Sequence, residues 1–551
     1  VESHPSGYLN FFANWEKLNQ LILSESNLDE FGSVDLGKNS TIVVEHTSVN
    51  PNKALHIGHI RNIVLGDIIA KILKKSNYKV NILNYVDDSG LQVADIIVGF
   101  RHFGFSQQPP QGKKFDHYCG DDVYVKTTEK YENDPSLEEI RKNILKELED
   151  GNSEIAQFAD KITRRVLENQ LETCWNLGVY YDCLNFESQI IRSGLWGKIF
   201  EKLKEMSLIE FENEGKNIGC WVIRGENAEE DKVIVRSNGT ATYIAKDIPY
   251  AAWKLGLLED PFNYQKYDKI QPGNHILWQT TLVDSVEPKQ NFTGKKVITV
   301  IDSRQARLQK IITTLMSKFK STEDAYVHLG YESVTLSADT AQTLGLNTDG
   351  KQAQMSGRKG LYVNADSVYD LLKNKIIEET TKRHPEMADY EIEKIAHHVS
   401  VGTLRYEMIK QDLDKIITFD LTKSLSLEGD TAPYIQYSYA RASRIIEKST
   451  RTPSIDVDFS LLNDLSELEL IKTIGLFDIH VMDAAKNLSP KVIARYCHDL
   501  AVVFNSFYEH AKVLDLGDEN LENSRLCLVN SFKLTLEKAL ELLGIVAPDK
   551  M

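Results

Sequence analysis

The chain has 551 residues, 42% of them hydrophobic, which is enough apolar material for about two to four domains. Its formal net charge of −16 argues against a surface that binds nucleic acid over its whole extent, so any such contact requires a local basic patch. The six cysteines are scattered without metal-ligand spacing, which argues against a disulfide framework or a structural metal. Neither a secretory signal nor a membrane span is visible, and we expect a cytoplasmic protein.

The first patterned region alternates strands and helices. Residues 41–45 form a β-branched run typical of a buried strand, and apolar residues from Gly58 to Leu73 recur at helical spacing. A second strand is expected over 79–84 and a second helix over 91–103. This alternation predicts an α/β fold with a Rossmann-type, doubly wound parallel sheet, whose ligands bind at the carboxyl ends of the strands.

The pattern changes further along the chain. Residues 106–187 contain a turn cluster and a charged helical stretch, which we interpret as an insertion, and sheet-like segments return at 232–236 and 296–301. From residue 368 onward helical periodicity predominates. We therefore expect four regions: a short N-terminal extension (1–40), a Rossmann-type domain with its insertion (41–365), a helical connector (366–428) and an all-α C-terminal domain (429–551).

A candidate site lies in the loop between the first strand and the first helix, where Lys53, His56, Gly58 and His59 follow closely on one another. A helix N-terminus presents free N–H groups and the positive end of the helix dipole, which favour a phosphate. Gly58 would let a nucleotide approach the backbone, and the two imidazoles could donate to phosphate oxygens. A loop with incidental histidines would explain these letters equally well, but the strand–loop–helix context favours a nucleotide site.

These residues carry a resemblance to a known family. His56-Ile57-Gly58-His59 resembles the HIGH signature of class I aminoacyl-tRNA synthetases, and the string from Glu45 to His56 resembles the arginyl branch of that class. Further blocks that resemble the arginyl family occur in the family's order at 84–92, 177–182, 235–247, 432–437 and 547–551. The resemblance implies an arginyl-tRNA synthetase, which uses ATP to convert L-arginine to arginyl-adenylate and transfers it to the 3′ end of tRNA(Arg).

The resemblance also implies an ATP site with Mg²⁺ carried by the nucleotide. Residues 354–360 are similar to the KMSKS loop of the class, although Gln354 and Gly357 stand where the signature has lysines. Lys53 occupies the place of a lysine that compensates for this departure in arginyl enzymes. The implied ATP-binding residues are His56, Gly58, His59, Met355, Ser356, Arg358 and Lys359, and the implied catalytic residues are His56, His59, Lys53, Ser356 and Arg358. Taken alone, 354–360 would be interpreted as a basic surface loop.

Recognition of arginine requires carboxylates that match a planar guanidinium. Glu45 ends the first strand, and Asp247 follows Tyr243 by one helical turn. A first-turn acid stabilised by the helix dipole would also explain Asp247, whereas a carboxylate that ends a buried strand needs a partner. The resemblance implies that the arginine pocket is lined by Glu45, Asn50, Tyr243, Asp247 and Gln305.

For tRNA, the resemblance implies that residues 429–551 form the anticodon-binding domain. Its candidate contacts are Tyr434, Gln436, Tyr437 and Arg441, because aromatic rings beside cations suit single-stranded bases. Tyrosines at this helical spacing are nevertheless core residues at least as often. The family usually carries a folded N-terminal domain that contacts the tRNA elbow, and residues 1–40 are too few for one, so we expect that contact to be reduced or missing.

Other functions remain as alternatives. A catalytically silent relative that binds tRNA or senses arginine would need a damaged ATP site, and the intact residues 56–59 argue against it. A class I synthetase for cysteine would need a zinc site, and those for large aliphatic amino acids a long editing insertion. Glutamate or glutamine specificity disagrees with an acidic pocket. We expect a monomeric enzyme that binds L-arginine, ATP and tRNA(Arg) and does not bind membranes.

Overall fold

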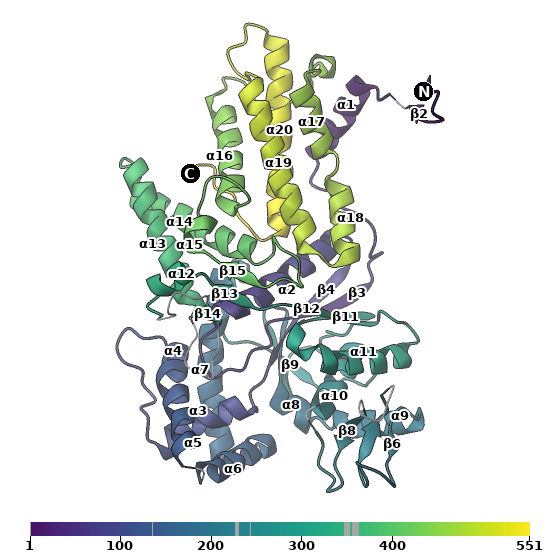
Figure 1. The fold of residues 1–551 in the computed structure, drawn as a ribbon, viewed down its shortest axis with the longest axis vertical. Helices are drawn as coiled ribbons and strands as arrows, with labels where there is room; N and C mark the ends of the chain where they lie inside the picture. The colour runs from purple at the N-terminus through teal and green to yellow at the C-terminus, as the bar shows by residue number, and fades with distance from the viewer. Residues whose placement is uncertain are drawn as a thin grey trace.

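The computed structural model describes residues 2–10, 12–134, 136–225, 231–242, 244–346, 353–354 and 363–551. The molecule is elongated, with a bundle of C-terminal helices at one end, a β-sheet in the middle and two smaller lobes at the other end (Figure 1). In the described ranges, no helix combines the length and the apolar content needed to cross a bilayer.

The central sheet has seven strands in the order β12-β11-β3-β4-β5-β10-β9. All neighbouring pairs are parallel except β9 with β10. This arrangement confirms the Rossmann-type sheet expected from the sequence. The strands are β3 (Thr41–Glu45), β4 (Lys79–Val86), β5 (Cys183–Phe186), β9 (Asn263–Lys266), β10 (Trp278–Thr281), β11 (Lys296–Asp302) and β12 (Tyr326–Tyr331).

Both faces of this sheet are covered, which explains why the three central residues of β3, Ile42 to Val44, are all apolar rather than alternating. Ile42 and Val44 belong to the hydrophobic core on the face of α2 (Ile57–Lys75) and the C-terminal helices. Val43, between them, belongs to a second core on the opposite face, together with α10 (Ile244–Lys254) and α11 (Ala306–Lys320). Successive side chains of a strand point to opposite faces, so one short strand contributes to two cores.

The insertion forms one of the two smaller lobes and has its own hydrophobic core. It follows α3 (Leu91–His102) and comprises α4 (Phe115–Tyr118), the π-helical turn η1 (Cys119–Tyr124), α5 (Val125–Asn133), α6 (Leu137–Asp150) and α7 (Glu154–Asn176). Strand β5 falls within the expected range 106–187, yet it is hydrogen-bonded between β4 and β10. The insertion therefore ends before β5, and the sequence-based boundary was placed too late.

The second small lobe contains α8 (Glu187–Arg192), α9 (Leu195–Glu205) and an antiparallel sheet of β6 (Glu210–Phe211), β7 (Trp221–Ile223) and β8 (Lys232–Val235). The sheet-like segment expected at 232–236 is thus a strand, but it lies outside the central sheet. The segment expected at 296–301 is β11, which pairs with both β3 and β12.

The C-terminal part is almost entirely helical, as the sequence predicts. Its one three-stranded sheet in the described residues joins β14 (Ala353–Gln354), β13 (Val334–Leu336) and β15 (Ile417–Phe419). The helices are α12 (Ala338–Thr343), α13 (Ala365–Arg383), α14 (Asp389–Glu407), α15 (Leu421–Ser424), α16 (Ala432–Lys448), α17 (Leu465–Ile474), α18 (Phe477–Asn487), α19 (Pro490–His510) and α20 (Glu519–Leu542).

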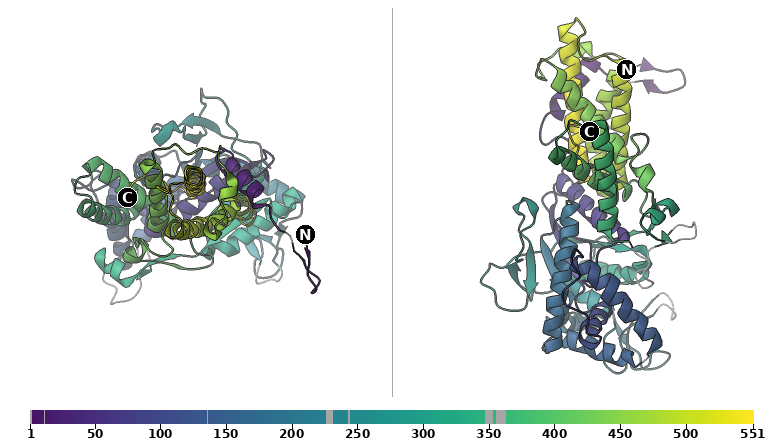
Figure 2. Two further views of the ribbon diagram at one scale, coloured as in Figure 1. Left: turned by 90° about the horizontal axis from the view of Figure 1, so that it is seen from above. Right: turned by 90° about the vertical axis from the view of Figure 1, so that its left-hand side faces the viewer.

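The N-terminal segment packs on the C-terminal bundle. Helix α1 (Trp15–Ser26) lies against α17 and α20, and the buried Asn19 amide donates to the carbonyl oxygens of Phe459 and Leu462. Before α1, strands β1 (Glu2–Ser3) and β2 (Leu9–Asn10) form a hairpin that projects from the bundle in both views of Figure 2. Helix α1 therefore holds the N-terminal segment against the C-terminal helices, which are distant from it in sequence.

Candidate active site

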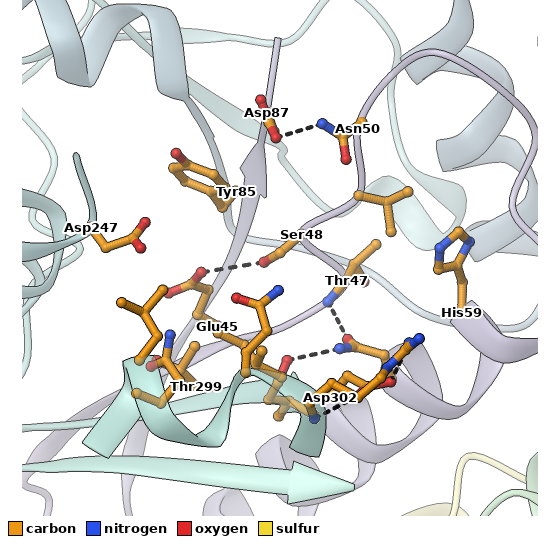
Figure 3. Close-up of a pocket in the computed structure, with 18 of the residues that line it drawn as sticks. Glu45, Thr47, Ser48, Asn50, His59, Tyr85, Asp87, Asp247, Thr299 and Asp302 are labelled. Atoms are coloured by element: carbon orange, nitrogen blue, oxygen red, sulfur yellow. Dashed lines mark hydrogen bonds and ion pairs between the residues drawn. The ribbon is translucent and has the colours of Figure 1, made fainter. Parts of the chain in front are cut away.

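A cavity of about 870 Å³ opens at the carboxyl ends of β3, β4 and β11. This is the edge at which parallel sheets bind ligands. Figure 3 shows Asp247 and Glu45 at one end of the cavity and His59 at the other, with Thr47 and Ser48 between them. Eight of the residues expected from the sequence line it: Glu45, Asn50, Lys53, His56, Gly58, His59, Asp247 and Gln305.

The two histidines stand at the N-terminus of α2, where His56 is the N-cap residue. Their rings are stacked, with centroids 3.5 Å apart and planes 18° apart. Burial, with the nearby charge of Lys53, lowers the pKa of His56 to about 3. Burial likewise holds the pKa of His59 well below its ordinary value, with further contributions from His56 and Lys53. Both rings are therefore neutral at neutral pH.

The hydrogen bonding of His59 determines which nitrogen carries its proton. The backbone N–H of His56 donates to Nδ1 of His59 at 3.2 Å, so the neutral ring carries its hydrogen on Nε2. A side chain at position 58 would displace the ring of His56, because a Cβ atom there would lie 2.9 Å from Cε1 of His56. The first turn of α2 thus offers an N–H donor from an uncharged ring, whereas the backbone N–H groups of Ile57 and His59 already donate to carbonyl oxygens.

The backbone of the His56 motif pairs with a segment from much later in the chain. The N–H of Ile57 donates to the carbonyl oxygen of Val363 at 3.1 Å, and the N–H of Ala365 donates to that of Leu55 at 2.8 Å. Met355, Ser356, Arg358 and Lys359, which were expected to bind ATP, lie outside the described residues. Residues 363–365, which come after this loop in the chain, lie beside His56.

Four carboxylates line the other end of the cavity: Glu45, Asp87, Glu187 and Asp247. Glu45 is 4% exposed and forms an ion pair with Lys254, which is 1% exposed. Oε1 of Glu45 also accepts a hydrogen bond from the Ser48 hydroxyl at 3.2 Å. Lys254 is the partner that a carboxylate at the end of a buried strand requires.

Burial and neighbouring carboxylates raise the pKa values of Asp247 and Glu187. Burial raises the pKa of Asp247 to about 7, and the negative charges of Glu187 and Glu45 add to this shift. Burial also raises the pKa of Glu187 well above its ordinary value, with a further contribution from Asp87. A planar cation bound among these groups would stabilise their ionised forms.

Two amide side chains border the same space, since Asn50 donates to Oδ2 of Asp87 at 2.5 Å and Gln305 lines the cavity. Tyr243, also expected here, lies outside the described residues.

Across the described ranges, the one group of side chains compact enough to hold a metal ion is Asp116, His117 and Asp366. It lies outside the cavity, between the insertion and α13. Oδ2 of Asp366 already accepts from Lys114 at 2.7 Å and from His117 at 3.0 Å. The ammonium group of Lys114 thus supplies the positive charge that a metal ion would bring, so these residues do not fit a metal site.

The candidate tRNA contacts on α16 are divided between the core and a surface groove. Gln436 is fully buried, and its amide donates to the carbonyl oxygens of His398 and Val546. Its assignment as a tRNA contact is therefore wrong for this conformation, because both amide hydrogens stabilise the domain. Tyr434 is half-buried, and its hydroxyl accepts a hydrogen bond from Asn505 at 3.0 Å.

Tyr437 and Arg441 line the groove, whose volume is about 1350 Å³. The Arg441 guanidinium lies 4.9 Å from the centroid of the Tyr437 ring and 4.7 Å from that of Tyr508, within the range of cation–π contacts. Four further cationic side chains line the groove: Arg444, Lys448, Lys512 and Lys550. Five carboxylates line it as well, namely Glu386, Glu391, Glu509, Asp515 and Asp549, so its charges are close to balanced although the whole chain is acidic.

Comparisons with known proteins agree with this geometry. The family model "tRNA synthetases class I (R), catalytic domain" matches residues 18–261, and the model "DALR anticodon binding domain" matches residues 435–551. The arginine–tRNA ligase of Thermococcus sibiricus is 35% identical over 100% of this chain and 87% of its own. The chain belongs to the arginyl-tRNA synthetase family.

Further relatives support the same membership. An arginine–tRNA ligase of Thermus thermophilus is 35% identical over 93% of this chain and 82% of its own. The solved structure of the Thermus thermophilus arginyl-tRNA synthetase matches with a TM-score of 0.84 at 33% identity, covering 100% of this chain and 88% of that one. The arginyl-tRNA synthetase structure from Plasmodium falciparum, at 18% identity and a TM-score of 0.74, shows the same fold. The resemblance and the fold class expected from the sequence are confirmed.

Several residues of this synthetase site were missed in the sequence. Asp87 follows β4 as the loop of the His56 motif follows β3, so the rule that ligands bind at strand ends could have identified it. Lys254 lies seven residues after Asp247, two turns along the same face of α10. Asn62 carries no such signal, yet it donates to the carbonyl of Val300 at 2.7 Å and ties α2 to β11.

Proposed function

We propose that this member of the arginyl-tRNA synthetase family activates L-arginine with ATP and transfers it to the 3′ end of tRNA(Arg), releasing AMP and pyrophosphate. One observation carries the proposal: a single cavity joins a phosphate-binding helix N-terminus to a pocket of four carboxylates. These two ends suit the two substrates of adenylation, a polyphosphate and a cationic amino acid. A catalytically silent protein would not need a phosphate site and a carboxylate pocket in the same cavity.

ATP is proposed to bind at the α2 end of the cavity. Nε2–H of His59 and the backbone N–H of Gly58 would donate to phosphate oxygens, and the buried ammonium of Lys53 would offset their charge. Mg²⁺ bound to the nucleotide would neutralise the leaving pyrophosphate. On the ground of the sequence resemblance, the proposed ATP site also includes His56, together with four residues of the loop 354–360: Met355, Ser356, Arg358 and Lys359.

Arginine is proposed to bind at the acidic end. The carboxylates of Glu45 and Asp247 would accept from the guanidinium in charge-assisted hydrogen bonds. Asn50 and Gln305, together with Tyr243 on sequence grounds, would complete the pocket. Lys254 keeps Glu45 in place by pairing with it inside the protein. The α-carboxylate of the substrate would then point toward the phosphates, which are bound at the opposite end of the same cavity.

The reaction would proceed in two displacement steps. An oxygen of the arginine carboxylate attacks the α-phosphorus of ATP, a new P–O bond forms, and the bond to pyrophosphate breaks. A ribose hydroxyl of the terminal adenosine of tRNA then attacks the carbonyl carbon of the adenylate and expels AMP. The neutral histidines act by hydrogen bonding to charge that develops on oxygen, and their low pKa values keep them from acting as cations.

We propose that tRNA binds across the C-terminal groove through Tyr437 and Arg441, with Tyr434 supporting the rim. The Arg441 guanidinium beside the rings of Tyr437 and Tyr508 is suited to stacking with an unpaired loop of RNA. We retain the division into residues 1–40, 41–365, 366–428 and 429–551, with the insertion shortened to end before β5. We also propose a cytoplasmic location, which the six free thiols support, and we keep the expectation of a monomer.

Exchange of labelled pyrophosphate into ATP, run with each of the twenty amino acids and with or without tRNA(Arg), tests the proposal. Exchange with arginine alone would support it. A folded protein that binds tRNA(Arg) yet exchanges with no amino acid would contradict it and favour the silent tRNA-binding alternative.

A further inference from the structure

A network of side chains outside the cavity converges on Asp366, in the first turn of α13. Its carboxylate accepts hydrogen bonds from three groups of the insertion. Lys114 donates to Oδ2 at 2.7 Å, His117 Nε2 donates to the same oxygen at 3.0 Å, and the Thr173 hydroxyl donates to Oδ1 at 2.8 Å. Although burial opposes ionisation, the His117 hydrogen bond and the Lys114 charge keep the pKa of Asp366 well below its ordinary value. The carboxylate is thus an ionised anchor.

The network continues to the residue next to the His56 motif. The ring of His117 also faces Asn364, whose side-chain amide nitrogen lies 3.2 Å from its Nδ1 atom. The backbone of Asn364 forms a β-bridge with that of His56. On both sides of this bridge, hydrogen bonds join Leu55 to Ala365 and Ile57 to Val363.

The insertion also holds the His56 motif from its other side. The N–H of Ala54 donates to the carbonyl of Asp116 at 3.1 Å, and Asp116 stands between Lys114 and His117 in the chain. One short helix, α4, therefore contacts both the segment that leads into His56 and the segment that pairs with it. Removing the Asp366 anchor would release one of these two contacts while the central sheet stays intact.

We propose that Asp366 is a positioning residue for adenylation, which fixes residues 363–366 to the insertion and thereby fixes the backbone and ring of His56. The proposal rests on the proposed function, because it assigns the positioned ring to the ATP end of the cavity. Asp366 touches neither substrate. Its effect is on the orientation of His56, and reactions in bound complexes are sensitive to displacements of about 1 Å, which can cost about 10²-fold in rate.

The Asp366→Asn variant tests this, because it keeps the shape of the side chain and removes its charge. The turnover of ATP–pyrophosphate exchange should fall about tenfold, an intermediate value on the scale for small misplacements, whereas the KM for arginine should change less than about twofold because the acidic pocket is untouched. Transfer from preformed arginyl-adenylate to tRNA(Arg), measured in a single turnover, should also change less than about twofold, since the α-phosphorus has already reacted. A merely structural role would slow both steps.

Asp95→Asn is the matched control. Asp95 is fully buried in α3 and pairs with Arg141 of the insertion at 2.7 Å. No hydrogen bond or ion pair of Asp95 in the described residues reaches 54–57 or 363–366. It should lower the Tm at least as much as Asp366→Asn and leave exchange turnover unchanged. Thr173→Val, which removes one donor to Asp366, should slow exchange in the same direction by a smaller factor.

Equal losses in exchange and transfer, unchanged exchange in Asp366→Asn, or the same exchange loss in Asp95→Asn would each overturn the proposal. These outcomes are distinct from failure of the proposed function, in which the unmodified protein would show no exchange with arginine.

Discussion

Arg405 of α14 forms a buried ion pair with Asp67 of α2, and this pair joins the helix that begins at His56 to the C-terminal helices. The Arg405 side chain is completely buried. Its Nε donates to the carbonyl of Leu543 at 2.6 Å, and another nitrogen donates to that of Leu177 at 2.9 Å. A Cβ atom on Gly544 would lie 2.2 Å from the guanidinium, so the backbone approaches it as closely as glycine permits. Three distant segments of the chain meet at this one side chain.

Arg405→Ala should therefore destabilise the protein strongly. It leaves Asp67 buried with only Lys71 as a cationic partner, and breaking a buried pair costs about 3–5 kcal/mol. Burial opposes ionisation of Asp67, but Lys71 and Arg405 lower its pKa to about 2. Their stabilising effect is thus complete above the unfolded pKa and is lost as pH falls toward 2. Urea denaturation at pH 7 and at pH 3 would measure it.

The control is Arg444→Ala, which removes an exposed pair with Glu447. It should change the free energy of unfolding by less than about 1 kcal/mol. If both variants lose the same small free energy of unfolding, the Arg405–Asp67 pair does not join α2 to the C-terminal helices as we describe.

Binding of arginine should depend on pH through Asp247. Because its pKa is raised to about 7 in the unoccupied pocket, the carboxyl is largely protonated at pH 6, and a guanidinium partner requires its ionised form. Arginine binding should release about one proton at pH 6, and the affinity should fall about tenfold per pH unit below 7. The same shift lowers the stability of the free protein as pH rises toward 7, and arginine should reverse that loss.

Isothermal titration at pH 6 and pH 8.5, in two buffers with different heats of ionisation, measures the proton count directly. A heat of binding that is independent of the buffer at pH 6 would contradict the assignment of Asp247 as a protonated pocket carboxyl.

His59→Ala should impair adenylation with little loss of stability. Removing one donor to developing charge typically costs about 10²–10³ in turnover, and the ring makes its contacts at the surface of the cavity rather than in a core. Pyrophosphate exchange, with circular dichroism as a check on folding, measures both effects. His398→Ala changes a histidine far from the cavity on α14 and should leave exchange unaltered. Equal turnover in the His59 variant and the unmodified protein would exclude His59 from catalysis.

Arg441→Ala should weaken tRNA(Arg) binding without affecting ATP or arginine, because Arg441 lies between two tyrosine rings in the C-terminal groove. Loss of one phosphate contact should reduce the dependence of log K on log salt by about 0.7 for single-stranded RNA, and loss of a stacking partner should add to the effect. Filter binding over a salt series measures both. Arg495→Ala, an exposed arginine on α19 outside the groove, is the control, and equal losses in the two variants would contradict a specific groove.

The sequence predicted the elements whose signals are local. The strand 41–45, the helix after Gly58 and the later helices follow from apolar periodicity alone. The ordered family blocks contain 14 of the 32 residues that line the cavity, including those at both of its ends. Strand β5 was missed because its four residues, following a long helix, acquire meaning only when β4 and β10 pair with them.

Gln436 was misplaced for a similar reason. Its burial depends on the return of the chain end, which brings the carbonyl of Val546 within 2.7 Å. Lys254 and Asn62 are likewise defined by partners that are distant in sequence. No pattern of neighbouring residues encodes such contacts, because they depend on how complete elements pack.

Pyrophosphate exchange in Asp247→Asn, beside the unmodified protein, tests the central claim most directly, namely that arginine is activated between the carboxylates and the His56 motif. With tRNA(Arg) present, the unmodified protein should exchange with arginine alone. In the variant the KM for arginine should rise by about 10–100-fold, the loss expected for one charge-assisted hydrogen bond, while the KM for ATP stays within about twofold because the nucleotide end is unchanged. An unchanged KM for arginine in the folded variant would contradict the account.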